Sequence, residues 1–132
     1  DLGHVVQYDN HEYHGTVFAR EMLPKYKYNQ FQIDEICRII MATKLPPRPN
    51  DILEKIICDS DLDYLGRSDF IPVSNTLYEE LKAQNKIGSL NDWNKIQVKF
   101  ISGHQYFTET ANRLREVNKQ MQIERIKSLI TE

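Results

Sequence analysis

The sequence is poor in residues that break or cross-link regular structure. Its 132 residues include only five glycines, five prolines and two cysteines, and they contain no internal repeat and no low-complexity tract. No apolar run reaches the length of about 18 residues that a membrane span needs, so we expect no membrane partner. The opening residues, Asp1-Leu2-Gly3-His4, also lack the basic and apolar stretches of a signal peptide. These absences favour a soluble, cytoplasmic protein.

An excess of charge of either sign is missing as well. The chain has 17 Lys and Arg against 19 Asp and Glu, which gives a net charge of −2 with neutral histidines and a pI near 6.1. Because nucleic-acid binders gain affinity from a surplus of basic residues facing phosphates, we expect no nucleic-acid partner. Cys37 and Cys58 each fall in an apolar helical pattern and are predicted to be buried thiols in a reducing compartment, not a disulfide.

What the sequence does contain is helical periodicity along nearly its whole length. At 40% hydrophobic residues the chain can form one globular core, and no segment alternates like a strand for more than a few residues. We expect helices over 11–23, 30–41, 50–64 and 74–86, a fifth from Ser89 that carries Trp93, Ile96 and Phe100, and a long or broken one over 105–130. Asn10, Asn29 and Asn50 are the predicted caps of the first three helices, and Ser89 with Asp92 forms a capping box. The sequence therefore predicts an all-α bundle of about five to seven helices, with residues 1–132 as a single domain.

The helix predicted over 50–64 combines an apolar stripe with an acidic end. We expect Ile52, Leu53, Ile56 and Ile57 to be buried. Asp59, Asp61 and Asp63 lie at the negative pole of the helix dipole, where each carboxylate is unfavourable unless a cation compensates it. The cluster is either a solvated helix end or a source of oxygen ligands for a divalent metal. Helical spacing places Asp59 and Asp63 nearer the centre of the stripe than Asp61.

Histidines are concentrated at the start of the chain. His4, His11 and His14 lie within the first 14 residues, among the acidic residues Asp1, Asp9 and Glu12. The plain interpretation is a polar loop that enters a helix, with His14 as a hydrogen-bonded core residue beside Gly15. The functional interpretation is that these side chains bind a metal or transfer a proton.

Three segments resemble one known superfamily. Asp1-Leu2-Gly3-His4 is similar to the segment that follows the histidine of the His-Asp dyad in the HD-domain metal-dependent phosphohydrolases. His11-Glu12, followed by Gly15, Ala19 and Leu23, resembles the next helix of that superfamily, as in its deoxynucleoside triphosphate triphosphohydrolase branch. The run from Ile56 to Arg67 resembles the late helix that supplies the last aspartate ligand. The resemblance covers about residues 1–67 and implies an HD-domain-like bundle.

This resemblance assigns roles to individual residues. Asp1 matches the dyad aspartate, and Asp61, with Asp59 as the second choice, matches the late aspartate, so these are the expected metal ligands. His11 matches a proton donor that is a ligand in two-metal members, and His4 matches a contact to the substrate phosphate.

The resemblance also implies one divalent metal ion, which could be Mn, Ni, Co, Mg or Fe. Thr43 stands where two-metal members have a further histidine, which favours a single metal. Lys44 and Arg67 are candidates for holding phosphate oxygens. Two histidine ligands are expected upstream of Asp1, so we expect the domain to be N-terminally incomplete and this segment to be inactive by itself.

The expected function is hydrolysis of a nucleotide, or of another small phosphate monoester or anhydride, by metal-activated water. The expected partner is thus a small phosphorylated substrate. The alternatives are a non-catalytic nucleotide-sensing or signalling module, and a helical adaptor without a ligand. The oligomeric state is not predicted by any of these patterns.

Overall fold

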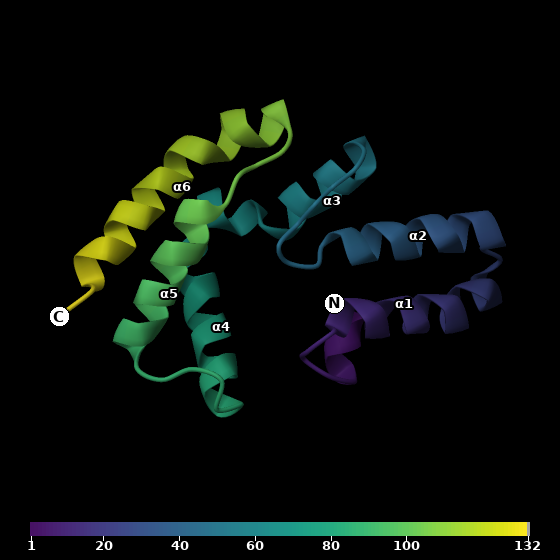
Figure 1. Ribbon diagram of the computed structural model, residues 1–132, viewed down its shortest axis with the longest axis horizontal. Helices are drawn as coiled ribbons and strands as arrows, with labels where there is room; N and C mark the ends of the chain where they lie inside the picture. Colours follow the sequence, from purple (N-terminus) through teal and green to yellow (C-terminus); the bar gives the residue numbers. More distant parts are fainter. Residues whose placement is uncertain (132) are drawn as a thin grey trace. The chain divides into compact units, whose positions relative to one another are not determined.

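The protein is all-helical in its computed structural model, which describes residues 1–131 and has no strand within them (Figure 1). The prediction of an all-α fold is therefore confirmed. The elements are η1 (Leu2–Val5), α1 (His11–Met22), η2 (Leu23–Tyr26), α2 (Gln30–Ala42), α3 (Ile52–Asp61), η3 (Asp63–Gly66), α4 (Phe70–Ala83), α5 (Leu90–Gly103) and α6 (Glu109–Leu129). None of these helices is long and apolar enough to cross a membrane. The chain divides into two compact units, Asp1–Asp61 and Leu62–Glu132.

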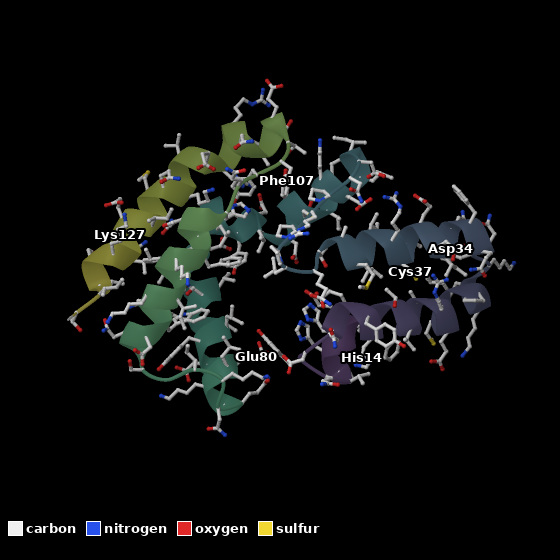
Figure 2. The ribbon with its side chains drawn as sticks, in the orientation of Figure 1. His14, Asp34, Cys37, Glu80, Phe107 and Lys127 are labelled. Carbon is white, nitrogen blue, oxygen red and sulfur yellow. The ribbon has the colours of Figure 1, made fainter. Side chains whose placement is uncertain are left out.

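The first unit is built on an antiparallel pair of helices, α1 and α2 (Figure 1). Near the turn between them, Arg20 Nη1 donates to Asp34 Oδ1 at 2.7 Å. About one turn nearer the beginning of α1, the Cys37 thiol donates to the Thr16 carbonyl oxygen at 3.7 Å. Figure 2 shows Asp34 near the beginning of α2 and Cys37 further along it. The end of α2 therefore lies beside the beginning of α1.

The caps of these two helices differ from each other. Asn29 forms the predicted type of cap, because its Oδ1 accepts from Gln32 N at 2.8 Å and Gln32 Oε1 accepts from Asn29 N at 3.0 Å. Asn10 was predicted to cap α1 in the same way, and this is wrong. Its backbone has a φ of 58° in the left-handed region and its side chain makes no capping bond. The Asn10 side chain faces Lys44 instead, with Oδ1 3.5 Å from Nζ.

Helix α3 is shorter than predicted. Asp51, not Asn50, provides the bond at its beginning, because Asp51 Oδ1 accepts from Glu54 N at 2.9 Å. The helix ends at Asp61 instead of Tyr64, and the chain continues into η3.

The apolar stripe predicted for α3 is wrong in its orientation. Ile52, Leu53 and Ile56 are 62%, 53% and 48% exposed. The buried residues of this helix are Glu54, Cys58 and Asp59. The Cys58 thiol donates to the Ala42 carbonyl oxygen at 3.1 Å, which packs this side of α3 against the end of α2. Cys37 and Cys58 are both free, buried thiols, as predicted.

An ionic cluster around Arg38 explains the orientation of α3. Arg38 Nη1 donates to Glu54 Oε2 and, at 2.6 Å, to Asp51 Oδ2, so one guanidinium of α2 binds both the beginning and the first turn of α3. Its Nη2 donates to Glu35 Oε2 at 2.7 Å, and this bond is the main reason that the pKa of Arg38 lies above its ordinary value. A buried carboxylate is stable only when it is paired. Glu54 therefore turns inward to Arg38, and the isoleucines on the other side turn outward.

The second unit has its own apolar core. Six buried side chains form it: Leu62, Leu65, Phe70, Ile101, Ile123 and Ile126. Helix α4 begins at Phe70, four residues before the predicted start, and Phe70 is 1% exposed. The capping box of Ser89 and Asp92 is present at the beginning of α5, as predicted.

Helix α6 buries polar as well as apolar residues. Ile126 is buried as its spacing predicts, but Leu114 and Met121 are exposed. Lys119 is 1% exposed, and its Nζ donates to the His104 carbonyl oxygen at 2.8 Å and contacts Glu116 Oε2 at 2.9 Å. These bonds compensate the loss of water around a buried cation.

Two glycines of the first unit should respond in opposite ways to the same substitution. A Cβ atom on Gly3 would lie 1.7 Å from the His11 carbonyl oxygen, whereas a Cβ on Gly15 would meet its nearest neighbour, Ile40 Cγ2, at 3.6 Å. We expect Gly3→Ala to lower the free energy of unfolding by at least about 1–3 kcal/mol, because backbone cannot yield as a side chain does. We expect Gly15→Ala to raise it by about 0.5–1 kcal/mol, because alanine is the better helix former. Urea denaturation of both variants measures the two changes, and a Gly3→Ala protein as stable as the wild type would show that η1 does not pack on α1.

Replacement of Arg38 should destabilise the protein, and a second substitution at Glu54 should reverse most of that loss of stability. Arg38→Met leaves the Glu54 carboxylate buried without a cation, so we expect a marked fall in the melting temperature. Adding Glu54→Leu removes the unpaired charge, and we expect it to restore most of the loss. Thermal unfolding followed by circular dichroism compares the variants. If the double variant is less stable than Arg38→Met alone, the pairing of Glu54 is not what holds α3.

Candidate metal centre

Asp1, His4 and His11 come together at the beginning of the first unit. One potential ligand atom from each lies within 4.8 Å of the others. The close approach of Gly3 to the backbone of His11 brings η1 back against α1 and so places Asp1 and His4 beside the first turn of that helix. The structure thus unites three of the residues that the sequence singles out.

The His11 ring is surrounded by hydrogen-bond acceptors. Its Nδ1 lies 3.2 Å from the Tyr8 carbonyl oxygen, and because a carbonyl can only accept, Nδ1 carries a proton. Its Nε2 lies 3.6 Å from Asp1 Oδ1 and 3.3 Å from Glu12 Oε1. A nitrogen lone pair that faces two carboxylates needs either a proton or a metal cation between them. His11 can therefore donate a proton or bind a metal through Nε2.

The His4 and His11 rings are stacked. Their centroids are 3.8 Å apart and their planes make an angle of 16°. A metal binds an imidazole along a lone pair that lies in the ring plane, and the lone pairs of nearly parallel rings do not converge on one point. In this arrangement one of the two rings suits a ligand, and the other suits contact with a neighbouring group.

A cavity of about 560 Å³ lies beside this cluster within the first unit. Asp1, His11 and Glu12 line it from the beginning of the chain, and Asp61 lines it from the end of α3. Residues about 50 to 60 positions apart in the sequence thus share one wall. Carboxylate oxygens and imidazole nitrogens are ligands that suit divalent manganese, iron, cobalt and nickel.

The rotation of α3 determines which aspartate reaches the cavity. Asp61 lies seven residues, or about two helical turns, after Glu54, so it is on the face that Arg38 turns inward. Burial by the cavity walls raises the pKa of Asp61, and the nearby His11 imidazole acts in the opposite direction. Asp59 is 6% exposed, and it is not among the described residues that line the cavity.

Lys44 and Arg67 lie outside this cavity wall. Lys44 lines a neighbouring depression of about 400 Å³, which it shares with Arg38 and Arg48. Arg67 belongs to the second unit, where its Nη2 donates to Asp69 Oδ2 at 3.0 Å. The roles of both residues in phosphate binding stay predictions.

Glu12 is a site residue that the sequence did not single out. It is 9% exposed, and its position in the first turn of α1 is ordinary for an acidic residue, because the helix dipole favours one there. The sequence feature that points to Glu12 is its position next to His11, in a helix whose inner face is apolar. His14, in contrast, is half-buried, with its ring 5.4 Å from that of Tyr13, and it does not join the cluster.

Metal binding should distinguish the two candidate aspartates of α3. In the intact protein we expect Asp61→Asn to weaken binding of Mn²⁺ by at least about tenfold, since a lost ligand costs no less than a lost outer-shell partner. Asp59→Asn is the matched control, two residues away on the same helix, and it should leave binding unchanged. Isothermal titration calorimetry with Mn²⁺ measures both. The reverse result would transfer the role of ligand to Asp59.

Comparison of the chain with protein-family models, with curated proteins and with solved structures finds no match. The similarity to HD-domain phosphohydrolases therefore stays a prediction from the sequence.

Proposed function

We propose that the protein is a metal-dependent phosphohydrolase of the HD-domain type and that Asp1, His4, His11 and Asp61 belong to its active site. The observation that carries this proposal is the gathering of Asp1, His4 and His11 within 4.8 Å of one another, at a cavity that Asp61 also lines. The order of these residues along the chain is the order that the family resemblance implies.

Asp1 and Asp61 would hold one divalent metal ion, such as Mn, Ni, Co, Mg or Fe. When bound, such an ion lowers the pKa of its water towards about 7 and polarises a phosphoryl oxygen. The two side chains fit this role, because both line the same cavity and carboxylate oxygens suit hard divalent ions such as Mn²⁺ and Mg²⁺.

The chain's own residues would then act on the substrate and the proton. In the reaction a water molecule releases one proton to solvent and its oxygen forms a bond to phosphorus. The bond from phosphorus to the ester oxygen breaks, and the leaving oxygen takes up a proton. His11 is the proposed donor of that proton. Its Nδ1 is hydrogen-bonded to the Tyr8 carbonyl oxygen, which leaves Nε2, on the acidic wall of the cavity, for proton transfer. Glu12 and Asp1 orient the ring through Nε2, at 3.3 and 3.6 Å.

His4 is the proposed contact to the phosphate, since it stacks on His11 and is exposed to solvent. Lys44, which lines the neighbouring depression, would add a cationic group for the phosphate oxygens. The proposed substrate is a small phosphate monoester or anhydride, of which a nucleotide is one example.

Replacement of His11 should separate proton transfer from metal binding. In the intact protein we expect His11→Ala to lower turnover by about a hundredfold to ten-thousandfold, the usual effect of losing a general acid, while the metal content changes little. His14→Ala is the control on the same helix, because His14 lies outside the cluster, and it should keep the wild-type rate. Steady-state hydrolysis of a phosphomonoester and elemental analysis of the same samples give the two quantities.

Two other outcomes would change the assignment. A loss of metal in His11→Ala equal to the loss of rate would make His11 a ligand instead of an acid. A metal-loaded wild-type protein that hydrolyses no phosphate ester would overturn the enzyme proposal in favour of a binding module.

A further inference from the structure

The cavity beside the metal cluster continues as an apolar space along α1 and α2. Because the two helices are antiparallel, the first turn of α1 faces the end of α2, and the later turns of α1 face the middle and the beginning of α2. The part of the lining away from the cluster, called here the apolar end, consists of Phe18, Ala19, Met22, Leu23, Ile36 and Ile39. From Glu12 to Met22 the helix rises by about 15 Å, so the cavity has room for more than a phosphate group.

Most of the charged side chains on the lining are acidic. Asp1, Glu12 and Asp61 line the cavity, and among the described residues that line it there is no lysine or arginine. A single phosphate could be held at the cluster by a divalent metal and the histidines. Each further phosphate of a polyphosphate chain would add negative charge next to three carboxylates, and no lysine or arginine of the described lining would attract it.

The size and chemistry of the apolar end suit an organic group. Small-molecule sites have volumes of about 300–1,000 Å³ and combine mainly apolar walls with a few polar groups that fix the orientation of the ligand. The cavity of about 560 Å³ has this composition, with its polar groups at the metal cluster. An apolar group that enters it would gain affinity from each methylene removed from water.

We infer that the substrate is the phosphate monoester of an apolar alcohol or phenol and not a nucleoside triphosphate. The phosphate lies at Asp1, His11 and Asp61, and the organic group lies in the apolar end. This assignment rests on the proposed phosphohydrolase function and specifies its substrate class.

Binding of alkylphosphonates tests the role of the apolar end without a need for turnover. The intact protein, loaded with Mn²⁺, is titrated with methylphosphonate, propylphosphonate and hexylphosphonate by isothermal titration calorimetry. We expect the dissociation constant to fall about two- to fourfold with each added methylene, as burial of that group implies. Ala19→Leu, which fills part of the apolar end, should reduce this dependence on chain length. Val17→Leu is the matched control, because Val17 is on the exposed side of the same helix and does not line the cavity.

A second measurement separates this inference from the proposed function. Hydrolysis of hexyl phosphate and of a nucleoside triphosphate is compared under the same conditions, and we expect a higher kcat/KM for hexyl phosphate. Faster hydrolysis of the triphosphate, or equal binding of methylphosphonate and hexylphosphonate, would overturn the substrate class while leaving the phosphohydrolase intact. Chain-length-dependent binding without hydrolysis of any ester would support the apolar end as a ligand site and overturn the enzyme proposal.

Discussion

The contact between Arg38 and Glu54 determines how the first unit is arranged. A guanidinium on α2 draws the carboxylate of Glu54 out of water, and this fixes the rotation of α3 about its own axis. Cys58 and Asp61 lie one and two turns further along the inward face, so Cys58 packs on the end of α2 and Asp61 reaches the cavity. A helix placed by apolar side chains alone would have buried Ile52, Leu53 and Ile56 and turned Asp61 away from the site. The position of a proposed metal ligand thus depends on an ion pair two helical turns away from it.

The parts of the fold that the sequence predicted correctly are those that depend on neighbours in the chain. The predicted cap at Asn29 and the predicted capping box at Ser89 each bind a residue three positions further along the chain, and both are present in the structure. The orientation of α3 depends on a partner 16 residues away, and hydrophobic periodicity contains no information about that partner. The predicted cap at Asn10 is absent for a related reason. Its backbone adopts the left-handed region and its side chain faces Lys44, 34 residues along the chain, which a local capping rule does not consider.

The candidate site, like the fold, was predictable only where it depends on residues close together in the sequence. The density of histidines at the start of the chain and the triplet of aspartates at the end of α3 are visible in the sequence, and the structure places His11 and Asp61 on one cavity. The choice between Asp59 and Asp61 was not decidable from periodicity, because it follows from the rotation of α3. Glu12 was seen beside the histidines but received no role, because an acidic residue in the first turn of a helix has an ordinary explanation. Its nearly complete burial, which depends on tertiary packing, is what sets it apart.

The buried thiol of Cys58 has a consequence for the chemistry next to it. Burial raises the pKa of Cys58, and the negative charges of Asp59, Asp61 and Glu54 raise it further. The sulfur is therefore a neutral thiol at physiological pH, three residues from the proposed ligand Asp61. Thiolates bind soft, thiophilic metals and react with peroxides, whereas neutral thiols do both poorly. The acidic surroundings that would attract a hard cation to Asp61 thus also favour the neutral form of the neighbouring sulfur, which binds soft metals and reacts with peroxides only weakly.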